Sequence, residues 1–386
     1  MESAVTSPIG LTSLLTPLLT ADSPLAPHFH SIGAFEKQER IGQGTYGSVY
    51  RCICRQTGEL VALKRIKLPE DKEGLPKSAV REIRMLRKLQ GHENIVKFMG
   101  LASSCPDKTR NKMKGGLYMV LEYTPHDLSG FLEFRNRHIE LAEDKNLILL
   151  LFTAVDFCHM QGVVHRDLKN QNCLIDATGR LVLCDFGLAR EIKTLSRGPG
   201  SSPGVNTSRV ITSWYRPPEL LLGATSYSME VDLWSAGAMA GELLVGRPLF
   251  AADRERQVFE LIVDIVGSLS TWENLPLAKD WWAPSCAAVP AALSGRRSTS
   301  ANSAGVGLSE KLKNVVLRDS TKQAVDLVRA MLELEPSKRL SCAAALEHPF
   351  FTDELPVPCR NADLLLPPES CLTMRMKETK RVRLVD

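Results

Sequence analysis

Residues 165–172 spell His-Arg-Asp-Leu-Lys-Asn-Gln-Asn, and residues 185–187 spell Asp-Phe-Gly. Transfer of a γ-phosphoryl group from a nucleotide needs an aligned hydroxyl, metal ions on the phosphate oxygens and neutralised charge. Asp167 can orient the attacking hydroxyl and accept its proton, and Lys169 can neutralise the transferred group. Asn172 and Asp185 offer two hard oxygen ligands, which suit Mg²⁺. The two motifs in this order favour a phosphoryl-transfer site over an acidic loop and a turn joined by chance.

A glycine-rich segment upstream supplies a second part of the expected site. Residues 42–49 fit the pattern G-x-G-x-x-G-x-V, in which glycine lets the backbone approach phosphates without a Cβ clash. Ile41 and Val49 flank it at strand spacing, and another short apolar strand follows at residues 61–64. A dinucleotide-binding fold would instead open a helix after the third glycine. The residues expected to approach the nucleotide at this turn are Gly42, Gly44, Thr45, Tyr46 and Gly47.

Lys64 ends the second of these strands and is the candidate for binding the α- and β-phosphates. Such a lysine needs an anion to hold it, and Glu82 in the helical-looking run 78–86 is the candidate partner. Taken alone, a solvated lysine and a surface glutamate are the simpler interpretation. With the other motifs in order, an ion pair within the site is favoured.

Together these motifs resemble those of a eukaryotic protein kinase, over residues 35–352. The resemblance implies an α+β, two-lobed fold, with ATP in the cleft between a small and a large lobe. The small lobe (35–124) would be rich in β-structure and carry one regulatory helix, and the large lobe (125–352) would be mainly helical. The backbone of Glu122 and Thr124 would contact adenine, and Asp127 would meet the ribose. The apolar residues expected around adenine are Ile41, Val49, Ala62 and Leu174.

Composition and charge agree with one catalytic domain plus extensions. Forty-eight Lys and Arg against 44 Asp and Glu give a net charge of +4, so neither nucleic acid nor a membrane surface is expected as a direct partner. The ten cysteines form no C-x₂-C pair, so we expect free thiols rather than a zinc site. No apolar run reaches the length of a membrane span.

Several segments depart from a compact kinase pattern. Residues 1–34 are expected to form a disordered extension, since they contain no Lys or Arg and fit neither a signal nor a transit peptide. Residues 101–116 form a long polar connection in the small lobe, and residues 283–307 a low-complexity surface insertion. Residues 353–386 form a tail that is first Pro-rich and then basic. Such tails are usually solvated, and a nuclear-import or docking role is the alternative.

Three arginines suggest how the site is regulated. Arg81, Arg166 and Arg190 lie in the small-lobe helix, beside Asp167 and after Asp-Phe-Gly, without obvious local acids. Guanidinium groups that converge need a dianion, which phosphorylated Thr207 could supply. Three unrelated surface arginines are the alternative interpretation. Further candidate phosphosites are Thr45 and Tyr46 in the glycine-rich turn.

Residues 210–219 resemble the proline-directed branch of the kinases. There, Arg216 helps to shape the pocket for a proline that follows the target residue. The resemblance also implies that Glu219 pairs with Arg339 and that Asp232 braces the catalytic loop.

Within that branch, the chain resembles a cyclin-dependent kinase. Residues 76–82 stand where that family has its cyclin-binding helix, and residues 44–47 match its glycine loop. The resemblance implies ATP and Mg²⁺ as cofactors, a cyclin as partner, and substrates with Ser or Thr followed by Pro.

Residues 72–76, 114–118 and 126–132 resemble the transcriptional members, which phosphorylate the C-terminal repeat of RNA polymerase II. A nuclear localisation follows, with a cytoplasmic pool left open. A cell-cycle cyclin-dependent kinase is the alternative within the class. A kinase-like, non-catalytic scaffold is the alternative of another class, but such scaffolds usually lose Lys64, Asp167 or Asp185, and all three stand here.

Cys184 departs from the family pattern, because a small residue usually precedes Asp-Phe-Gly. Its side chain should face the nucleotide cleft. Lys64 could lower the pKa of this thiol and make it reactive, whereas burial would raise the pKa and leave it inert.

Overall fold

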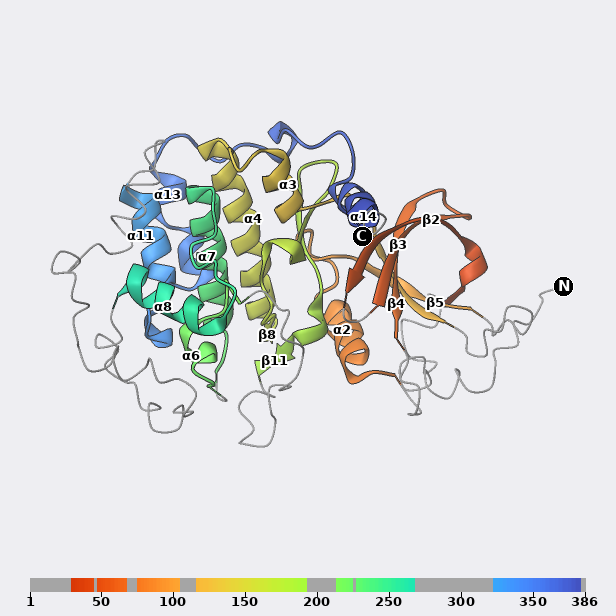
Figure 1. Cartoon of the computed structure of the whole chain (residues 1–386), viewed down its shortest axis with the longest axis horizontal. Coiled ribbons are helices and arrows are strands. Elements are labelled where there is room, and N and C mark those ends of the chain that lie inside the picture. Colours follow the sequence, from red (N-terminus) through yellow and green to blue (C-terminus); the bar gives the residue numbers. More distant parts are fainter. Residues whose placement is uncertain are drawn as a thin grey trace.

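The computed structural model of the 386-residue chain describes residues 29–44, 47–67, 75–104, 116–192, 213–224, 227–267 and 322–382. A β-sheet with one flanking helix forms one end of the molecule, and a group of helices forms the other (Figure 1). The expected α+β, two-lobed architecture is therefore confirmed.

A six-stranded sheet forms the small lobe. Its strands are β1 (Phe29–Ser31), β2 (Phe35–Gly44), β3 (Gly47–Cys54), β4 (Leu60–Ile66), β5 (Phe98–Ser103) and β6 (Leu117–Glu122). Their spatial order is β1-β5-β6-β4-β3-β2, and every pair except the parallel β1–β5 pair is antiparallel. Because side chains alternate between the faces of a strand, Ala62 and Ile66 join the main core while Val61 and Leu63 join a small cluster on the opposite face. The same alternation places Lys64 on the face of Ala62.

Helix α2 (Lys77–Lys88) covers one side of this sheet (Figure 1). Its buried residues include Ala79, Glu82, Ile83 and Leu86, whose spacing of three or four places them along one stripe of the helix. Glu82 is thus the one acidic member of a stripe that is otherwise apolar. The helix packs against the turn η5 (Phe186–Leu188), which contains two residues of Asp-Phe-Gly.

The large lobe is mainly helical. Its helices are α3 (Leu128–Phe134), α4 (Leu141–Met160), α6 (Pro218–Leu221), α7 (Glu230–Val245), α8 (Glu255–Val266), α11 (Lys322–Met331), α12 (Cys342–Leu346) and α13 (Pro349–Thr352). Short strands β7 (His126–Asp127), β8 (Val163–Val164), β9 (Cys173–Ile175), β10 (Leu181–Leu183) and β11 (Arg190–Glu191) form two small sheets, β10-β9-β7 and β11-β8. The remaining short turns are η2 (Ile32–Ala34), η4 (Asn170–Asn172), η7 (Pro336–Lys338) and η8 (Asn361–Asp363).

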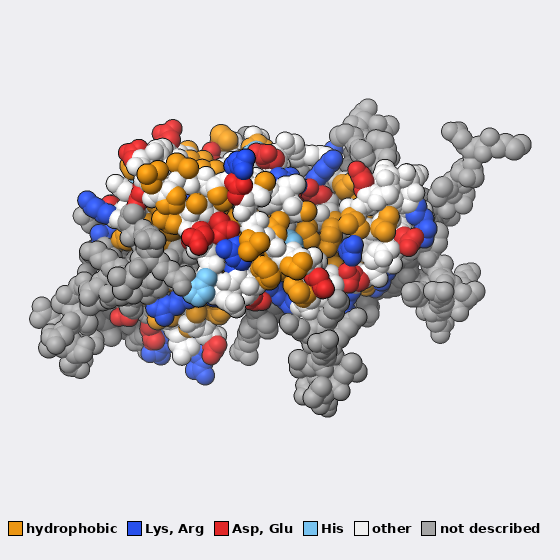
Figure 2. All heavy atoms as spheres, turned by 90° about the horizontal axis from the view of Figure 1, so that it is seen from above, with side chains coloured by type: hydrophobic (Ala, Val, Ile, Leu, Met, Phe, Trp, Pro, Cys, Tyr) orange, Lys and Arg blue, Asp and Glu red, His pale blue; other side chains and the backbone are white. Residues whose placement is uncertain are grey.

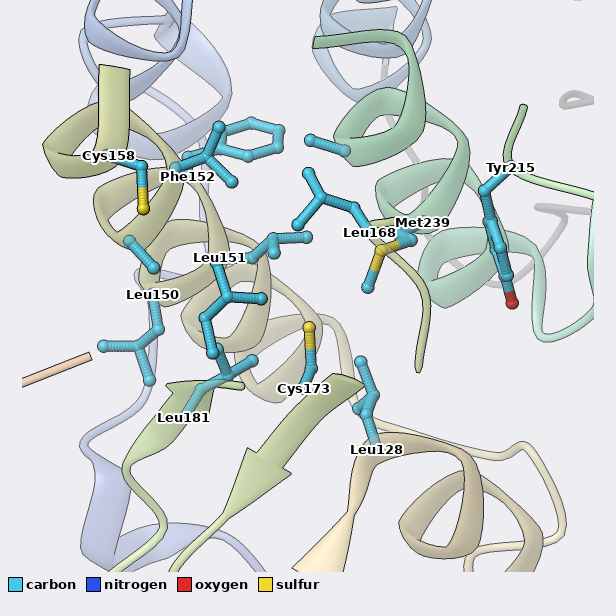
Figure 3. Packing of buried hydrophobic residues seen from close by; sticks show 14 of the residues in the cluster. Leu128, Leu150, Leu151, Phe152, Cys158, Leu168, Cys173, Leu181, Tyr215 and Met239 are labelled. Atoms are coloured by element: carbon cyan, nitrogen blue, oxygen red, sulfur yellow. The ribbon is translucent and has the colours of Figure 1, made fainter. Parts of the chain in front are cut away.

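The core of the large lobe lies between α4 and α7, which are buried over most of their lengths. Leu168, from the loop that carries Asp167, is buried in this core near Met239 of α7 and Cys173 of β9 (Figure 3). This apolar anchor fixes the loop that carries the predicted catalytic residues. The eight described cysteines are free thiols, as expected.

The N-terminal boundary differs from the expected one. Residues 29–34, expected within the disordered extension, form β1 and η2, because the edge of β5 offers backbone hydrogen-bonding groups to a further strand. Residues 1–28, most of the polar connection (105–115) and the insertion at 283–307 lie outside the described residues.

The C-terminal tail packs against the large lobe instead of being merely solvated. Lys145 Nζ donates to Glu354 O at 2.6 Å, Cys359 N to Ala142 O at 3.0 Å, and Asn146 Nδ2 to Asn361 Oδ1 at 3.0 Å. The tail then forms helix α14 (Cys371–Val382), which lies beside β2 and α3 (Figure 1). It therefore spans from the large lobe to the small one.

Acidic and basic side chains are intermixed on the face drawn in Figure 2 and do not gather into an area of one sign. This agrees with the net charge of +4. Within the described part of the chain, no helix has both the length and the apolar character that crossing a membrane requires.

Candidate active site

Three charged side chains meet between the two lobes. Lys64 Nζ donates to Glu82 Oε1 at 2.6 Å and to Asp185 Oδ1 at 2.9 Å. The lysine comes from β4, the glutamate from the buried stripe of α2, and the aspartate from the residue before η5. The expected Lys64–Glu82 ion pair is confirmed. Lys64 also contacts the second carboxylate, that of Asp185. Helix α2 is therefore positioned so that Glu82 reaches Lys64.

The charges of this triad depend on one another. Burial opposes the charge on Lys64, but Glu82 and Asp185 outweigh it and raise the pKa of the ammonium group. Burial raises the pKa of the Glu82 carboxyl, and Lys64 offsets only part of that rise. Burial would also raise the pKa of Asp185, but Lys64 prevails and lowers it. Asp185 is therefore held as the anion that a metal ligand must be.

The catalytic loop gathers a second set of polar groups. Asp167 Oδ2 accepts from Lys169 Nζ at 2.6 Å and from Asn172 Nδ2 at 3.1 Å. The same Asn172 nitrogen donates to the backbone oxygen of Asp167 at 2.8 Å. Both charged side chains of the pair remain partly exposed, at 19% for Lys169 and 15% for Asp167. Asp167 is thus fixed in orientation and still partly open to solvent.

Asp232 at the start of α7 braces this loop, as the resemblance implied. Its carboxylate accepts from the backbone N–H groups of His165 and Arg166, each at 2.7 Å, and from His159 Nε2 at 3.0 Å. Arg166 has a φ of 72° and Asp185 a φ of 63°, a left-handed backbone that non-glycine residues rarely adopt. Such strain persists where the surroundings over-determine it, and it clusters at functional sites.

The glycine-rich turn shows why one glycine cannot be replaced. Gly47 has a φ of +146°, and a Cβ atom there would lie 1.9 Å from the backbone oxygen of Arg65. Gly42 would meet only ordinary contacts with Val49. Thr45 and Tyr46 lie outside the described residues. The four apolar residues expected around adenine belong to or pack against one hydrophobic cluster: Ile41, Val49, Ala62 and Leu174.

Residues 122–127 join the lobes, and we call them the hinge. The N–H of Glu122 donates to Lys97 O at 3.1 Å and is thus not available to a ligand. The Thr124 hydroxyl is buried and has no hydrogen-bond partner among the described residues. A buried polar atom without a partner is costly, so the hinge fits a ligand that brings polar groups, as adenine does.

Asp127 has a partner that the sequence did not suggest. Its Oδ1 accepts from Gly130 N at 2.8 Å, capping α3, and Arg375 of α14 donates to both oxygens at 3.0 and 3.3 Å. Burial raises the pKa of the Asp127 carboxyl, and Arg375 only partly opposes this. A ribose could therefore contact Asp127 as expected only if Arg375 gave up at least one of its hydrogen bonds to this carboxylate.

The oxygen donors fit Mg²⁺. Because Asn172 uses its amide nitrogen on Asp167, its amide oxygen is the atom left for a metal. The Asp185 carboxylate is the second candidate oxygen donor. No cluster of three or more His, Cys, Asp or Glu able to hold a metal occurs in the part of the chain described here. Two protein ligands completed by phosphate oxygens and water suit Mg²⁺.

The three arginines predicted to bind a phosphate lie on segments that are linked near Asp-Phe-Gly. Arg190 pairs with Val164 across β11 and β8, two residues before Arg166. Arg81 Nη1 donates to Gly187 O at 3.2 Å. Thr207 lies outside the described residues, so its role stays a prediction.

Two expected contacts of the large lobe can be compared with the structure. Glu219 and Arg339 form the expected ion pair, with two contacts at 2.6 and 2.7 Å between fully buried side chains. Arg216, expected at the proline pocket, pairs with Glu255 of α8. Glu255 and Arg375 were not identified from the sequence. In the sequence these two residues are distinguished only by their charge, which they share with many surface residues.

The surroundings of Cys184 favour an unreactive thiol over a reactive one. Burial raises its pKa well above the ordinary value, and this effect outweighs the opposing charge of Lys64. The thiolate required for reactivity is therefore suppressed.

Comparisons with known proteins agree with this geometry. The protein kinase domain model matches residues 35–351. Cyclin-dependent kinase C-2 of Arabidopsis thaliana is 38% identical over 85% of this chain and 61% of its own length. The CTD kinase subunit alpha of Schizosaccharomyces pombe is 37% identical over 87% of this chain and 51% of its own length. Cyclin-dependent kinase 9 of Danio rerio is 34% identical over 87% of this chain and 85% of its own length.

The chain spans about three fifths of the length of the plant relatives it matches. The domain match covers most of the chain, and the zebrafish relative is matched along most of its length. The chain belongs to the protein kinases and, within them, to the cyclin-dependent kinase family.

Proposed function

We propose that this chain is a cyclin-dependent serine/threonine kinase that transfers the ATP γ-phosphoryl group to Ser or Thr followed by Pro. The observation that carries the proposal is the assembled triad, in which Lys64 contacts both Glu82 and Asp185. A non-catalytic scaffold would have no need to hold a partly buried lysine between two carboxylates, because that arrangement is costly unless it is used.

Each residue has a role that its contacts support. Asp167 orients the substrate hydroxyl and accepts its proton, and the amide of Asn172 keeps the carboxylate in place. Lys169 and Lys64 balance the negative charge of the phosphates. Asn172 and Asp185 would hold Mg²⁺, which would neutralise charge on the phosphate oxygens. The Gly47 turn lets the backbone approach the nucleotide.

Substrate choice would depend on the large lobe, whereas regulation would involve both lobes. Arg216, held by Glu255, favours proline after the phosphorylated residue. A cyclin bound at α2, together with phosphate on Thr207, would engage Arg81, Arg166 and Arg190 and order the activation segment.

We further propose that the substrate is the Ser-Pro-rich C-terminal repeat of RNA polymerase II and that the protein acts in the nucleus. Support comes from the names of the relatives, one of which is a CTD kinase subunit. A cell-cycle role remains the alternative, and the peptide comparison below distinguishes the two.

The test is peptide phosphorylation by the chain purified with its cyclin. Wild type should phosphorylate Ser-Pro heptad peptides, and Asp167→Asn should lower turnover by about 10²-fold or more while the melting temperature holds. Preference for a Ser-Pro site followed by a basic residue would indicate the cell-cycle role. Near-normal activity of Asp167→Asn would overturn the catalytic assignment, and an inactive wild-type complex would favour the scaffold.

A further inference from the structure

The start of the hinge is held by side chains that none of the kinase motifs contains. Glu122 ends β6 and is the first residue of the hinge. Both oxygens of its carboxylate are engaged: Oε1 accepts from Lys97 N at 2.7 Å, and Oε2 accepts from Arg180 Nη2 at 2.9 Å. The side chains of Glu122 and Arg180 are only 19% and 25% exposed. This pair is therefore better shielded from water than a surface salt bridge.

Arg180 is itself anchored in the large lobe. It follows the turn between β9 and β10, where Asp176 Oδ1 accepts from Thr178 N at 2.8 Å and Arg180 N at 3.0 Å. Asp176 Oδ2 accepts from Arg180 Nε at 2.8 Å. Burial would raise the pKa of Asp176, but these hydrogen bonds lower it. Asp176 thus fixes the backbone and the Nε atom of Arg180, and the two Nη atoms extend beyond this anchor.

The remaining guanidinium nitrogen connects a third segment. Arg180 Nη1 donates to Glu93 O at 2.6 Å, in the loop that follows α2. That loop is already docked on β10, since Asn94 Nδ2 donates to Leu181 O at 2.7 Å and Leu183 N donates to Asn94 O at 2.8 Å. One planar side chain therefore joins the large-lobe turn, the loop after α2 and the hinge.

We propose that Arg180 is a positioning residue for the nucleotide, which sets adenine affinity by holding the Glu122 peptide without touching the base. The inference rests on the proposed adenine contact at the hinge. A guanidinium directs its N–H groups along fixed, coplanar directions, and each of the three nitrogens of Arg180 makes one of these contacts. Lysine has a point charge and cannot reproduce the fork, so Arg180→Lys should recover only part of the effect.

The experiment measures binding of MgATP and of adenosine to the full chain by titration calorimetry. Arg180→Gln should raise both dissociation constants by the same factor, about tenfold, because adenosine shares the hinge contacts but lacks the phosphates. Glu122→Gln should shift both in the same direction, and the double variant should add little to Arg180→Gln. Thr178→Ala is the matched control, since it loosens the same turn without removing a contact to the hinge.

The outcomes separate positioning from simple structural support. Equal weakening of ATP and adenosine by Arg180→Gln, with Thr178→Ala unchanged, supports the proposal. Lower melting temperature with unchanged dissociation constants overturns it, as does weakening of ATP alone. If Arg180→Gln does not fold, Arg180→Lys and Glu122→Gln are measured instead, and the same comparison of MgATP and adenosine dissociation constants tests the proposal. A wild-type chain that binds neither ligand would refute the proposed adenine site itself, whereas an effect missing only in the variants refutes this inference alone.

Discussion

Replacing Lys64 with methionine would leave two carboxylates facing each other without the cation between them. Lys64 Nζ lies 2.6 Å from Glu82 Oε1 and 2.9 Å from Asp185 Oδ1, and the Glu82 side chain is only 4% exposed. Removing one partner of a buried ion pair typically costs about 3–5 kcal/mol, because the other charge stays buried without compensation. We expect Lys64→Met to lose about that much unfolding free energy at neutral pH, together with its phosphoryl-transfer activity.

The pH dependence of this loss has a definite sign. Burial raises the pKa of Glu82 even in the presence of Lys64, and removing the cation removes an influence that lowers it. A carboxyl whose folded-state pKa exceeds its unfolded value is destabilising while charged, and protonation relieves the cost. The stability deficit of Lys64→Met should therefore be full at mildly alkaline pH and shrink as the pH falls through the raised pKa of Glu82.

The assay is urea unfolding of wild type and variant at mildly alkaline and mildly acidic pH. Lys88→Met is the matched control, because Lys88 pairs with Glu191 at 3.6 Å on the surface, with side chains 36% and 39% exposed. Such a pair contributes about 0–1 kcal/mol. Equal losses in the two variants, or a Lys64→Met deficit that does not change with pH, would refute the reasoning.

Three further outcomes are expected. Arg339→Met should destabilise the chain by about 3–5 kcal/mol in urea unfolding, because it leaves Glu219 buried and unpaired; a loss below that of an exposed pair would contradict it. Arg375→Ala should tighten ATP binding by about fivefold in calorimetry, because it frees Asp127 for the ribose; weaker binding would show that the arginine assists the nucleotide. Cys184 should resist a cleft-directed electrophile at neutral pH, since burial raises its pKa, and an ATP-protectable adduct in mass spectrometry would contradict this.

The predicted catalytic residues could be singled out in the sequence because the proposed chemistry requires fixed residue types at short, fixed spacings. Asp167, Lys169 and Asn172 lie within six residues, and the structure finds them in hydrogen-bond contact. The Lys64–Glu82 pair could be predicted because each residue stands in its own motif on a strand and a helix of evident pattern.

The solvated tail expected from the sequence is wrong, because the contacts of the tail depend on long-range packing and not on a local motif. Its basic composition predicted a solvated segment, but Arg375 contacts Asp127, 248 residues earlier in the chain. A contact over that separation depends on the path of residues 353–370 along the large lobe, which no local pattern specifies. Likewise, whether Lys64 or burial governs the Cys184 thiol depends on how closely the surrounding core packs.

The motifs and the strand and helix periodicity of the sequence were thus enough to predict the reaction class, the fold and the charged residues of the site. Which charged groups pair with one another became visible only in the folded chain. Arg375 engages the expected ribose ligand, and Arg180 holds the hinge through Glu122. This is because a buried charged side chain forms hydrogen bonds with the partner that lies nearest in space. Which partner is nearest depends on how the lobes and the tail pack together.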